Sequence, residues 1–213
     1  ASRNESKTLS LLQSNLSNMP NSDSKGPGEA YWIGFMMADG YVVEMEKQET
    51  QIGLTLKDRE QVEDFKTFFN LDNKVGVKTV NGKDYYRLHT YNNELADYFA
   101  ANGIFQNKTF SANPPENLKY SRHFWRGIVD GDGCIDYQKD TPRLRLKMGS
   151  RKVVKRFKEF ADLESRASVR SVESQWVYSV HANEVIHLLR ELYIPSTHYL
   201  QRKKQKVIGY APK

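Results

Sequence analysis

Two aspartates at equivalent positions of an internal repeat are the side chains of this sequence best placed to do chemistry. Asp39 follows the apolar run YWIGFMMA, Asp132 follows FWRGIVDG, and a glycine comes directly after each aspartate. Aligned on the aspartates, the two segments match at tryptophan, glycine and apolar positions with a constant offset of 93 residues, from 39 to 132. Carboxylate oxygens are the ligands that Mg²⁺ prefers. The duplication therefore predicts a metal site shared by two halves of the chain.

Small residues four positions apart give each segment a face almost without side chains. Gly34 and Ala38 share one helical face in the first copy, and Gly127 and Gly131 share it in the second. Another helix can approach such a face until the backbones nearly touch. A glycine inside a helix costs about 1 kcal/mol relative to alanine, and close packing against the other copy offsets that cost. We predict two helices packed face to face.

The crossing of these helices determines where the aspartates lie. It brings Asp39 and Asp132 side by side at the C-terminal ends of both helices. Like charges repel there, and a helix C-terminus is an unfavourable place for an anion. A divalent cation held between the carboxylates relieves both problems. Gly40 and Gly133 are typical of left-handed caps that end each helix directly after its aspartate.

The two segments resemble the paired copies of the LAGLIDADG motif, the signature of a family of homing endonucleases, in a single-chain member with two repeats. The second copy is close to the family pattern, and the first departs from it at Met37, where the family often has a first aspartate. The resemblance covers residues 30 to 205. It implies a DNA endonuclease that makes a double-strand break with 3′ overhangs at a long target site, leaving 5′-phosphate and 3′-hydroxyl ends.

The resemblance also implies a set of catalytic residues and a cofactor. The metal ligands are the carboxylates of Asp39 and Asp132 with the backbone of Gly40 and Gly133. Mg²⁺ is the expected ion, with Mn²⁺ able to substitute and Ca²⁺ supporting binding without cleavage. Family members commonly place one lysine from each repeat near the scissile phosphates. Lys108 stands where the motif puts one in the first repeat, whereas the second repeat has no lysine at the aligned position, leaving Lys203 or Arg202 to fill the place.

The segments that follow each motif predict the same order of elements in both halves. Alternating apolar residues and turn residues indicate two strands, a helix, a hairpin and a further helix after each motif helix. In the first half we expect strands at 41–46, 50–56, 75–80 and 84–90, a type I′ turn at Asn81-Gly82, a helix with an Asp58/Gln61 capping box, and a helix from Asn92 or Asn93. In the second half we expect strands at 134–137, 143–148, 168–172 and 175–181, a helix capped by Ser150, and a helix from Asn183.

The predicted fold is therefore α+β, with two pseudo-symmetric αββαββα repeats. Each repeat is a curved four-stranded antiparallel sheet backed by helices, and the repeats join at the two motif helices. We assign residues 30–120 to the first repeat and 121–213 to the second. Residues 1–29 are Ser- and Asn-rich with balanced charge and read as an N-terminal extension or linker, in which Leu9, Leu11, Leu12 and Leu16 provide one or two amphipathic turns.

Positive charge is concentrated in the second half of the chain. Residues 121–213 hold 19 Lys and Arg against 10 Asp and Glu, whereas residues 30–120 hold 10 against 13. Arg143, Arg145 and Lys147 alternate along one predicted strand, so they share one sheet face. Such a face is either an ordinary solvated surface or a contact for DNA, and a curved sheet fits a major groove of about 12 Å. The candidate DNA contacts, to base edges or to phosphates, are Gln51, Thr55, Lys57, Lys78, Lys83, Tyr85, Arg87, Arg143, Arg145, Lys147, Arg170, Arg202 and Lys204.

Composition excludes several other classes of protein. The single Cys134 excludes a disulfide framework and fits a reducing compartment. No stretch approaches the roughly 20 apolar residues of a membrane span, and no Ser-His-Asp or P-loop pattern is present. We expect an intracellular protein, in an organelle (mitochondrion or chloroplast) or a prokaryotic cytoplasm, that binds double-stranded DNA as a monomer. Two alternatives keep the same fold: an RNA-binding maturase with intron RNA as partner, and a non-cleaving DNA-binding protein.

Overall fold

The computed structural model describes residues 25–45, 49–163 and 167–210. It has two four-stranded antiparallel sheets and, within the described residues, seven α-helices, so the predicted α+β fold of two repeats is confirmed. The amphipathic turns expected around Leu9 to Leu16 lie outside the described residues. Helix α2 (Pro27–Ala38) begins inside the segment 1–29 that the sequence assigned to an extension.

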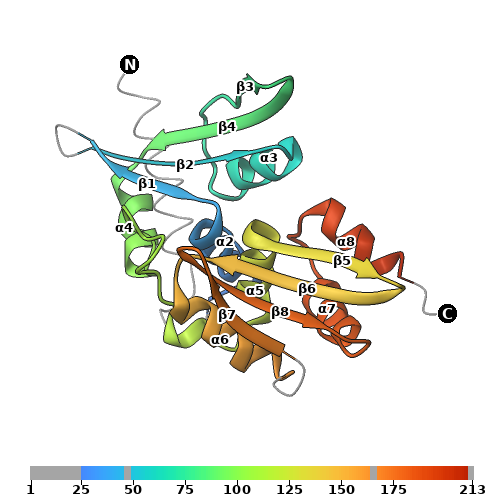
Figure 1. Ribbon diagram of the computed structural model, residues 1–213. Helices are drawn as coiled ribbons and strands as arrows, with labels where there is room; N and C mark the ends of the chain where they lie inside the picture. The colour runs from blue at the N-terminus through green and yellow to red at the C-terminus, as the bar shows by residue number, and fades with distance from the viewer. Residues whose placement is uncertain (1–24, 46–48, 164–166, 211–213) are drawn as a thin grey trace.

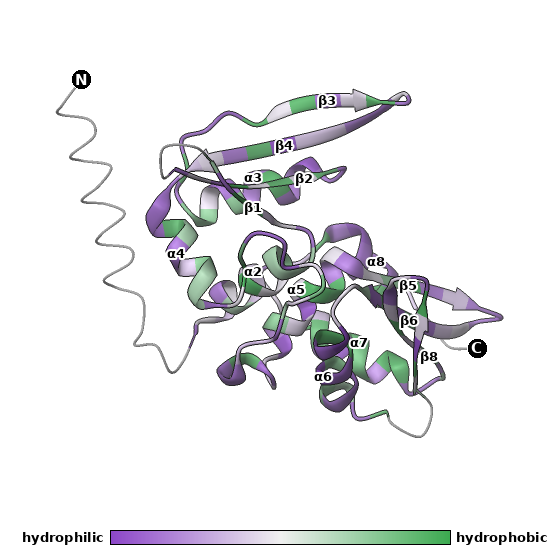
Figure 2. Cartoon of the chain, turned by 60° about the vertical axis from the view of Figure 1, so that its left-hand side comes forward, coloured by the Kyte–Doolittle hydropathy of each residue, from purple (hydrophilic) through white to green (hydrophobic). Residues whose placement is uncertain are grey.

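The first sheet has the strand order β1-β2-β4-β3. Its strands are β1 (Tyr41–Glu44), β2 (Thr50–Leu56), β3 (Gly76–Val80) and β4 (Lys83–Tyr91). Helices α3 (Arg59–Phe68) and α4 (Asn93–Ala101) pack against β2 and β4, and Figure 2 shows both helices below β3 and β4. The β3–β4 turn contains Asn81 at φ 50° and Gly82 at φ 71°. Both angles lie in the left-handed region that a type I′ turn requires, which confirms the predicted hairpin.

The second sheet repeats this topology as β5-β6-β8-β7. Its strands are β5 (Gly133–Gln138), β6 (Thr141–Met148), β7 (Ala167–Val172) and β8 (Gln175–His181). Helices α6 (Arg151–Ala161) and α7 (Val185–Tyr193) pack against β6 and β8. A last helix, α8 (Gln201–Ile208), contacts α7 and β5. The sequence marked α8 only as a basic run, because it has few apolar residues to give a helical period.

Helices α2 and α5 (Arg122–Asp132) lie side by side at the centre of the molecule, between the two sheets (Figure 1). A Cβ added to Gly34 would overlap the carbonyl oxygen of Phe124, and one added to Gly127 would overlap the carbonyl oxygen of Tyr31. The two backbones are therefore in direct contact at the glycines, as the small-residue faces predict. Large side chains on the other faces of both helices, including Trp32 and Trp125, are fully buried in the two cores.

The predicted helix caps are only partly correct. Gly40 and Gly133 are absent from the left-handed region, and Gly133 has an extended φ of −82°, because the chain turns directly from each helix into a strand. Added Cβ atoms at both glycines would meet the preceding helical turn, at Met36 and Val129, which explains why glycine is needed. Asp58 precedes α3 without a side-chain capping bond, so the expected capping box is wrong, whereas Asn92 and Ser150 cap α4 and α6 as predicted.

Candidate active site and nucleic-acid interface

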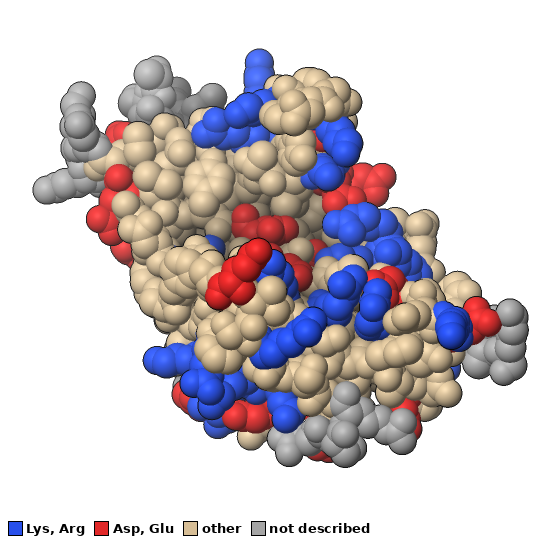
Figure 3. Space-filling model, viewed as in Figure 1, with Lys and Arg blue, Asp and Glu red and all other residues tan. Residues whose placement is uncertain are grey.

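The packing of α2 against α5 brings the two predicted carboxylates together. Asp39 is the C-cap residue of α2, and Asp132 is the last residue of α5. A Cβ added to Gly131, the neighbour of Asp132, would lie 3.5 Å from the carboxyl carbon of Asp39. In Figure 3 the surface is hollowed between the two sheets, with acidic side chains inside the hollow and lysine and arginine side chains along its rims.

The acid pair is electrostatically strained in the metal-free protein. Burial and the negative charge of Asp39 raise the pKa of Asp132 to about 7, against the opposing effect of Lys108 and Lys203. Burial also raises the pKa of the Asp39 carboxyl, against the opposing effect of Lys203 and Lys108, although the residue as a whole is exposed. A bound divalent cation would stabilise the charged form of both carboxylates.

Two buried lysines reach the ends of the same helices. Lys108 is 8% exposed, and its Nζ donates a hydrogen bond to the carbonyl oxygen of Gly40 at 2.6 Å. Lys203 is 3% exposed, and its Nζ donates to the carbonyl oxygen of Gly133 at 2.7 Å. The two repeats therefore place their lysines on equivalent carbonyls, although the second repeat has no lysine at the position aligned with Lys108. An insertion of two residues relative to the 93-residue offset hides the correspondence.

These hydrogen bonds bear on the backbone ligands expected from the sequence. The carbonyl oxygens of Gly40 and Gly133 each accept an ammonium hydrogen bond, and a divalent cation on the same oxygen would be repelled by that charge. The side-chain carboxylates of Asp39 and Asp132 are free of such partners among the described residues. They are the better metal ligands of the set.

Asp130 organises a buried polar network that the sequence did not predict. Its carboxylate accepts hydrogen bonds from the Tyr31 hydroxyl at 2.9 Å, the Tyr193 hydroxyl at 2.6 Å and the backbone N–H of Leu200 at 2.7 Å. Leu200 is the residue before α8, so this carboxylate fixes the start of the helix that carries Lys203. The only available signal was a charged residue in an apolar helix, at the position where the first copy has Met37.

The candidate contacts of the first repeat share one face of its sheet. Thr55 pairs with Arg87, and Lys78 pairs with Tyr85, so these side chains project to the side opposite the buried Leu54 and Leu88. The remaining members of this face are Gln51, Lys57 and Lys83. The side chain of Gln51 donates to the Tyr91 hydroxyl at 2.8 Å, and the ammonium of Lys57 lies 5.5 Å from the centre of the Tyr85 ring. Lys83 pairs with Val80 across the hairpin.

The corresponding face of the second sheet is basic but braced by one acid. Arg143 pairs with Asp136 and Arg145 with Cys134 across β5 and β6. The Asp136 carboxylate accepts hydrogen bonds from Arg143 at 2.7 and 3.0 Å and from Arg145 at 2.8 Å. These ion pairs hold both guanidinium groups in fixed positions, and the buried Nε of Arg145 has no partner among the described residues. Arg170 and Lys147 are exposed.

Two further candidates from the sequence have partners of their own. Arg202 pairs with Asp58 of the first repeat at 3.1 Å, which links the repeats. The ammonium of Lys204 lies 3.6 Å from the centre of the Tyr199 ring. By contrast, a pocket of about 150 Å³ adjoins Asp132, the second acid of the pair, and is also lined by Lys108, Lys147 and Gln175, among others. A phosphate group in this pocket would meet two lysines.

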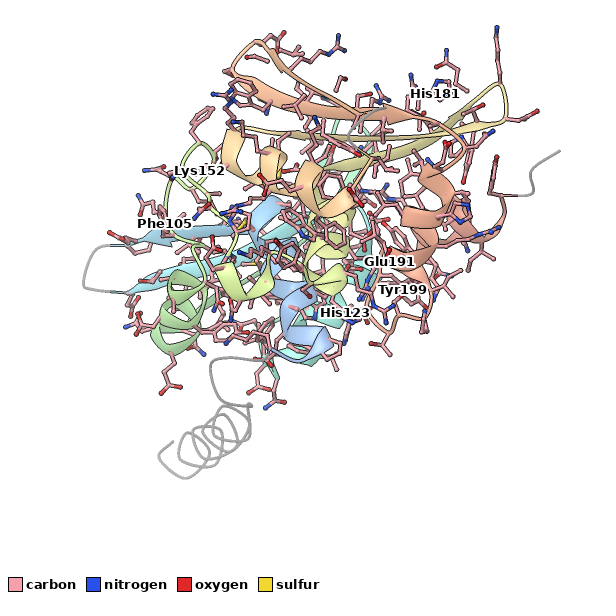
Figure 4. All side chains as sticks on the ribbon, turned by 90° about the horizontal axis from the view of Figure 1, so that it is seen from below. Phe105, His123, Lys152, His181, Glu191 and Tyr199 are labelled. Atoms are coloured by element: carbon pink, nitrogen blue, oxygen red, sulfur yellow. The ribbon has the colours of Figure 1, made fainter. Side chains whose placement is uncertain are left out.

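The histidines and the cysteine form no alternative centre. Figure 4 shows His181 at the outer end of the second sheet and His123 near the start of α5, well apart from each other. No group of three or more His, Cys, Asp or Glu with metal-binding geometry occurs in the part of the chain that the structure describes.

None of the described helices is long and apolar enough to cross a membrane.

Comparison with known proteins agrees with this architecture. A family model of a LAGLIDADG-like domain matches residues 28–103. No curated protein matches the chain in sequence. Among solved structures, the homing endonuclease I-WcaI bound to its DNA recognition sequence is 15% identical with a TM-score of 0.62, over 85% of each chain. The K262A mutant of I-SmaMI is 15% identical with a TM-score of 0.58, over 86% of this chain and 90% of that one.

A third solved structure, I-DmoI in complex with DNA and Mn, is 14% identical with a TM-score of 0.54, over 79% of this chain and 97% of that one. The fold and the paired central helices thus define a two-repeat α+β protein of the LAGLIDADG architecture. The chain carries a LAGLIDADG-like domain at residues 28–103, as its first motif predicts, and its second half repeats the same topology.

Proposed function

We propose that the protein is a homing endonuclease, a site-specific DNA endonuclease that depends on a divalent metal and breaks both strands of a long target. One observation carries this proposal. Asp39 and Asp132 lie together at the ends of two packed helices, and the two sheets on either side carry Lys, Arg and Gln on their exposed faces. A monomer suffices, because a single chain supplies both sheets and both acids.

The donor set of this site fits a hard divalent cation such as Mg²⁺. Two carboxylates lie close to each other, and burial together with the negative charge of Asp39 raises the pKa of Asp132. When bound, such a cation supplies charge neutralisation and Lewis-acid stabilisation of negative charge on a phosphodiester. Mn²⁺ would substitute for it, and Ca²⁺ would support binding without cleavage.

Each sheet would occupy the major groove of one half-site. The exposed side chains of β2, β4 and β6 alternate with buried ones, so they share one polar face of each sheet that can contact the major groove. Exposed lysines can hold phosphates, whereas the fixed guanidinium groups of Arg143 and Arg145 suit the reading of base edges. The acid pair would then face the backbone of both strands near the centre of the target.

The reaction is hydrolysis of one phosphodiester on each strand. The oxygen of a water molecule bonds to phosphorus, and the bond between phosphorus and the 3′ oxygen breaks. The 3′ oxygen takes one proton and leaves as a hydroxyl, while the second proton of the water is lost from the new 5′-phosphate. The ammonium of Lys108, which donates to the carbonyl oxygen of Gly40 and whose side chain lines the pocket beside Asp132, would stabilise the negative charge that develops on the phosphoryl oxygens.

The solved structures with the same fold give this proposal its context. Their descriptions record a homing endonuclease bound to its DNA recognition sequence, a complex of I-DmoI with DNA and Mn, and I-SmaMI bound to an uncleaved DNA target in the presence of calcium ions. At 15% identity or less, these structures show that the fold is shared and do not show that the activity is. The proposed endonuclease activity therefore rests on Asp39 and Asp132 of this chain.

The test is selection for cleavage from a large pool of random duplex DNA, in Mg²⁺ and in Ca²⁺. We expect one long sequence to be cut in Mg²⁺ with 3′ overhangs, 5′-phosphate and 3′-hydroxyl ends, and to be bound but uncut in Ca²⁺. The Asp132→Asn variant should bind that sequence without cutting it. Asp97→Asn, the same change at an exposed residue of α4, is the matched control and should cut normally.

Other outcomes would replace this proposal with one of its alternatives. A sequence that is bound tightly and never cut in Mg²⁺ or Mn²⁺ would indicate a DNA-binding protein without nuclease activity. Tight and selective binding to a structured RNA, with no DNA sequence recovered, would indicate an RNA-binding maturase.

A further inference from the structure

The hydrogen bonds of Lys203 leave this ammonium group without a free donor. Its Nζ donates to the carbonyl oxygens of Val129 at 2.6 Å, Asp130 at 2.7 Å and Gly133 at 2.7 Å. A lysine ammonium has three N–H donors, so all three are used by the protein backbone. At 3% exposed, the group also has almost no surface to present to a ligand.

The acceptors of Lys203 show what this residue does. Val129 and Asp130 lie in the last turn of α5, and the carbonyl oxygen of Val129 also accepts the N–H of Gly133. The last carbonyl groups of a helix lack partners within the helix. A cation at this end also interacts favourably with the helix dipole. Lys203 therefore caps the helix that ends in Asp132, and its own helix α8 is tied to α5 by the hydrogen bond from Leu200 to Asp130.

Lys108 is placed differently in the first repeat. Among the described residues, the carbonyl oxygen of Gly40 is its only hydrogen-bond acceptor, at 2.6 Å, which leaves two N–H donors. The same side chain lines the pocket of about 150 Å³ beside Asp132. The carboxylate that organises the second repeat has no equivalent here, because Met37 stands in place of Asp130.

We infer that the two half-sites are chemically unequal: Lys108 is a catalytic residue that donates to the phosphate of one strand, whereas Lys203 is a positioning residue that holds α5 and Asp132. This inference rests on the proposed endonuclease function. One strand is then cut with a directly bonded ammonium group and the other without it. The protein should nick one particular strand first, and singly nicked DNA should accumulate before the double-strand break.

The experiment uses a supercoiled plasmid that carries the selected target, together with duplexes labelled on either strand. For the wild type in Mg²⁺ we expect a nicked intermediate with about nine nicks in ten or more on the same strand, because the rates of the two strands should differ by about tenfold or more. Lys108→Met should slow the faster strand by about 100-fold and leave the rate of the slower strand unchanged. The strand preference should therefore vanish or invert.

Lys203→Met is the matched variant, with the same chemical change in the other repeat. It should lower the melting temperature and slow both strands by one common factor, so that the strand preference survives. If this variant does not fold, Asp130→Asn, which keeps the size of the side chain, should likewise slow both strands equally.

Equal rates on both strands of the wild type would overturn the inference while leaving the endonuclease proposal intact. The same holds if Lys203→Met slows a single strand at an unchanged melting temperature. A wild-type protein that cuts neither strand in Mg²⁺ or Mn²⁺ would instead refute the endonuclease function, and the inference would fall with it.

Discussion

Replacing Gly127 with alanine should force apart the two central helices and with them the acid pair. An added Cβ at this position would overlap the carbonyl oxygen of Tyr31 and lie 2.6 Å from the backbone nitrogen of Phe35. Neither atom can rotate away, because both belong to the backbone of α2. The helices must therefore separate along their closest contact.

The cost can be worked out from this geometry. Inserting a methyl group into a well-packed core costs about 1 to 3 kcal/mol, and contact with rigid backbone on both sides favours the upper end of that range. Alanine returns about 1 kcal/mol through its better helix propensity. The net loss should be about 2 kcal/mol, which moves the urea midpoint down by about 1 M for a slope near 2 kcal/mol per M.

The assay is urea unfolding in EDTA, followed by the fluorescence of the buried Trp32 and Trp125. Gly76→Ala is the control, because its added Cβ would have no neighbour closer than 3.8 Å. At equal denaturant, Gly127→Ala should also bind Mg²⁺ more weakly, since the carboxylates move with their helices. A midpoint shift no larger than that of the control would refute the reasoning, because it would show that the two backbones are not in contact.

Two further predictions concern charge. Burial and the negative charge of Asp39 raise the pKa of Asp132 to about 7 in the folded, metal-free protein, from an ordinary value of 3.8. Between these two pH values the folded state therefore binds more protons than the unfolded state. The free energy of unfolding in EDTA should consequently fall as the pH rises from about 4 to 7. Asp132→Asn should flatten this part of a melting-temperature profile against pH, and an unchanged slope would contradict the assigned shift. Asp136→Asn releases Arg143 and Arg145 from the ion pairs at 2.7 and 2.8 Å. Binding to random DNA should therefore tighten and depend more steeply on salt concentration. Discrimination among variants of the target should fall, because the arginines are no longer held in position. Binding isotherms at several salt concentrations test this, and unchanged discrimination would show that the acid does not position the arginines.

Much of the fold follows from local patterns in the sequence. The alternation of apolar residues in residues 50–56 and 143–148, the Asn81-Gly82 turn and the capping residues Asn92 and Ser150 each act over a few residues, so they are legible without the tertiary structure. The duplication adds long-range information, because two equivalent small-residue faces have each other as natural partners. This is why the sequence alone predicts the pairing of α2 with α5 and the adjacency of Asp39 and Asp132.

Other features depend on contacts between distant segments. Gln61 and Asp58 form a capping box by pattern, yet Gln61 donates to the Tyr31 hydroxyl at 2.8 Å and Asp58 pairs with Arg202. In the same way, the alternation on β6 indicates a basic face, but only the register between β5 and β6 places Asp136 beside two of its arginines. Local pattern gives the face on which a side chain lies, and strand pairing decides its partner.

The sequence by itself determined the two repeats, the sheets, the small-faced helices and the acid pair, because periodicity and duplication are properties of the chain. Only the tertiary structure decided the roles of the lysines. Lys203 lies 70 residues beyond the carbonyl of Gly133 that it contacts, and an insertion shifts it from the position of Lys108 in the repeat. Its three backbone acceptors lie together at the end of α5, but Lys203 reaches them only once α8 has packed in place, and the hydrogen bond from Leu200 to the buried Asp130 carboxylate holds the start of α8 there.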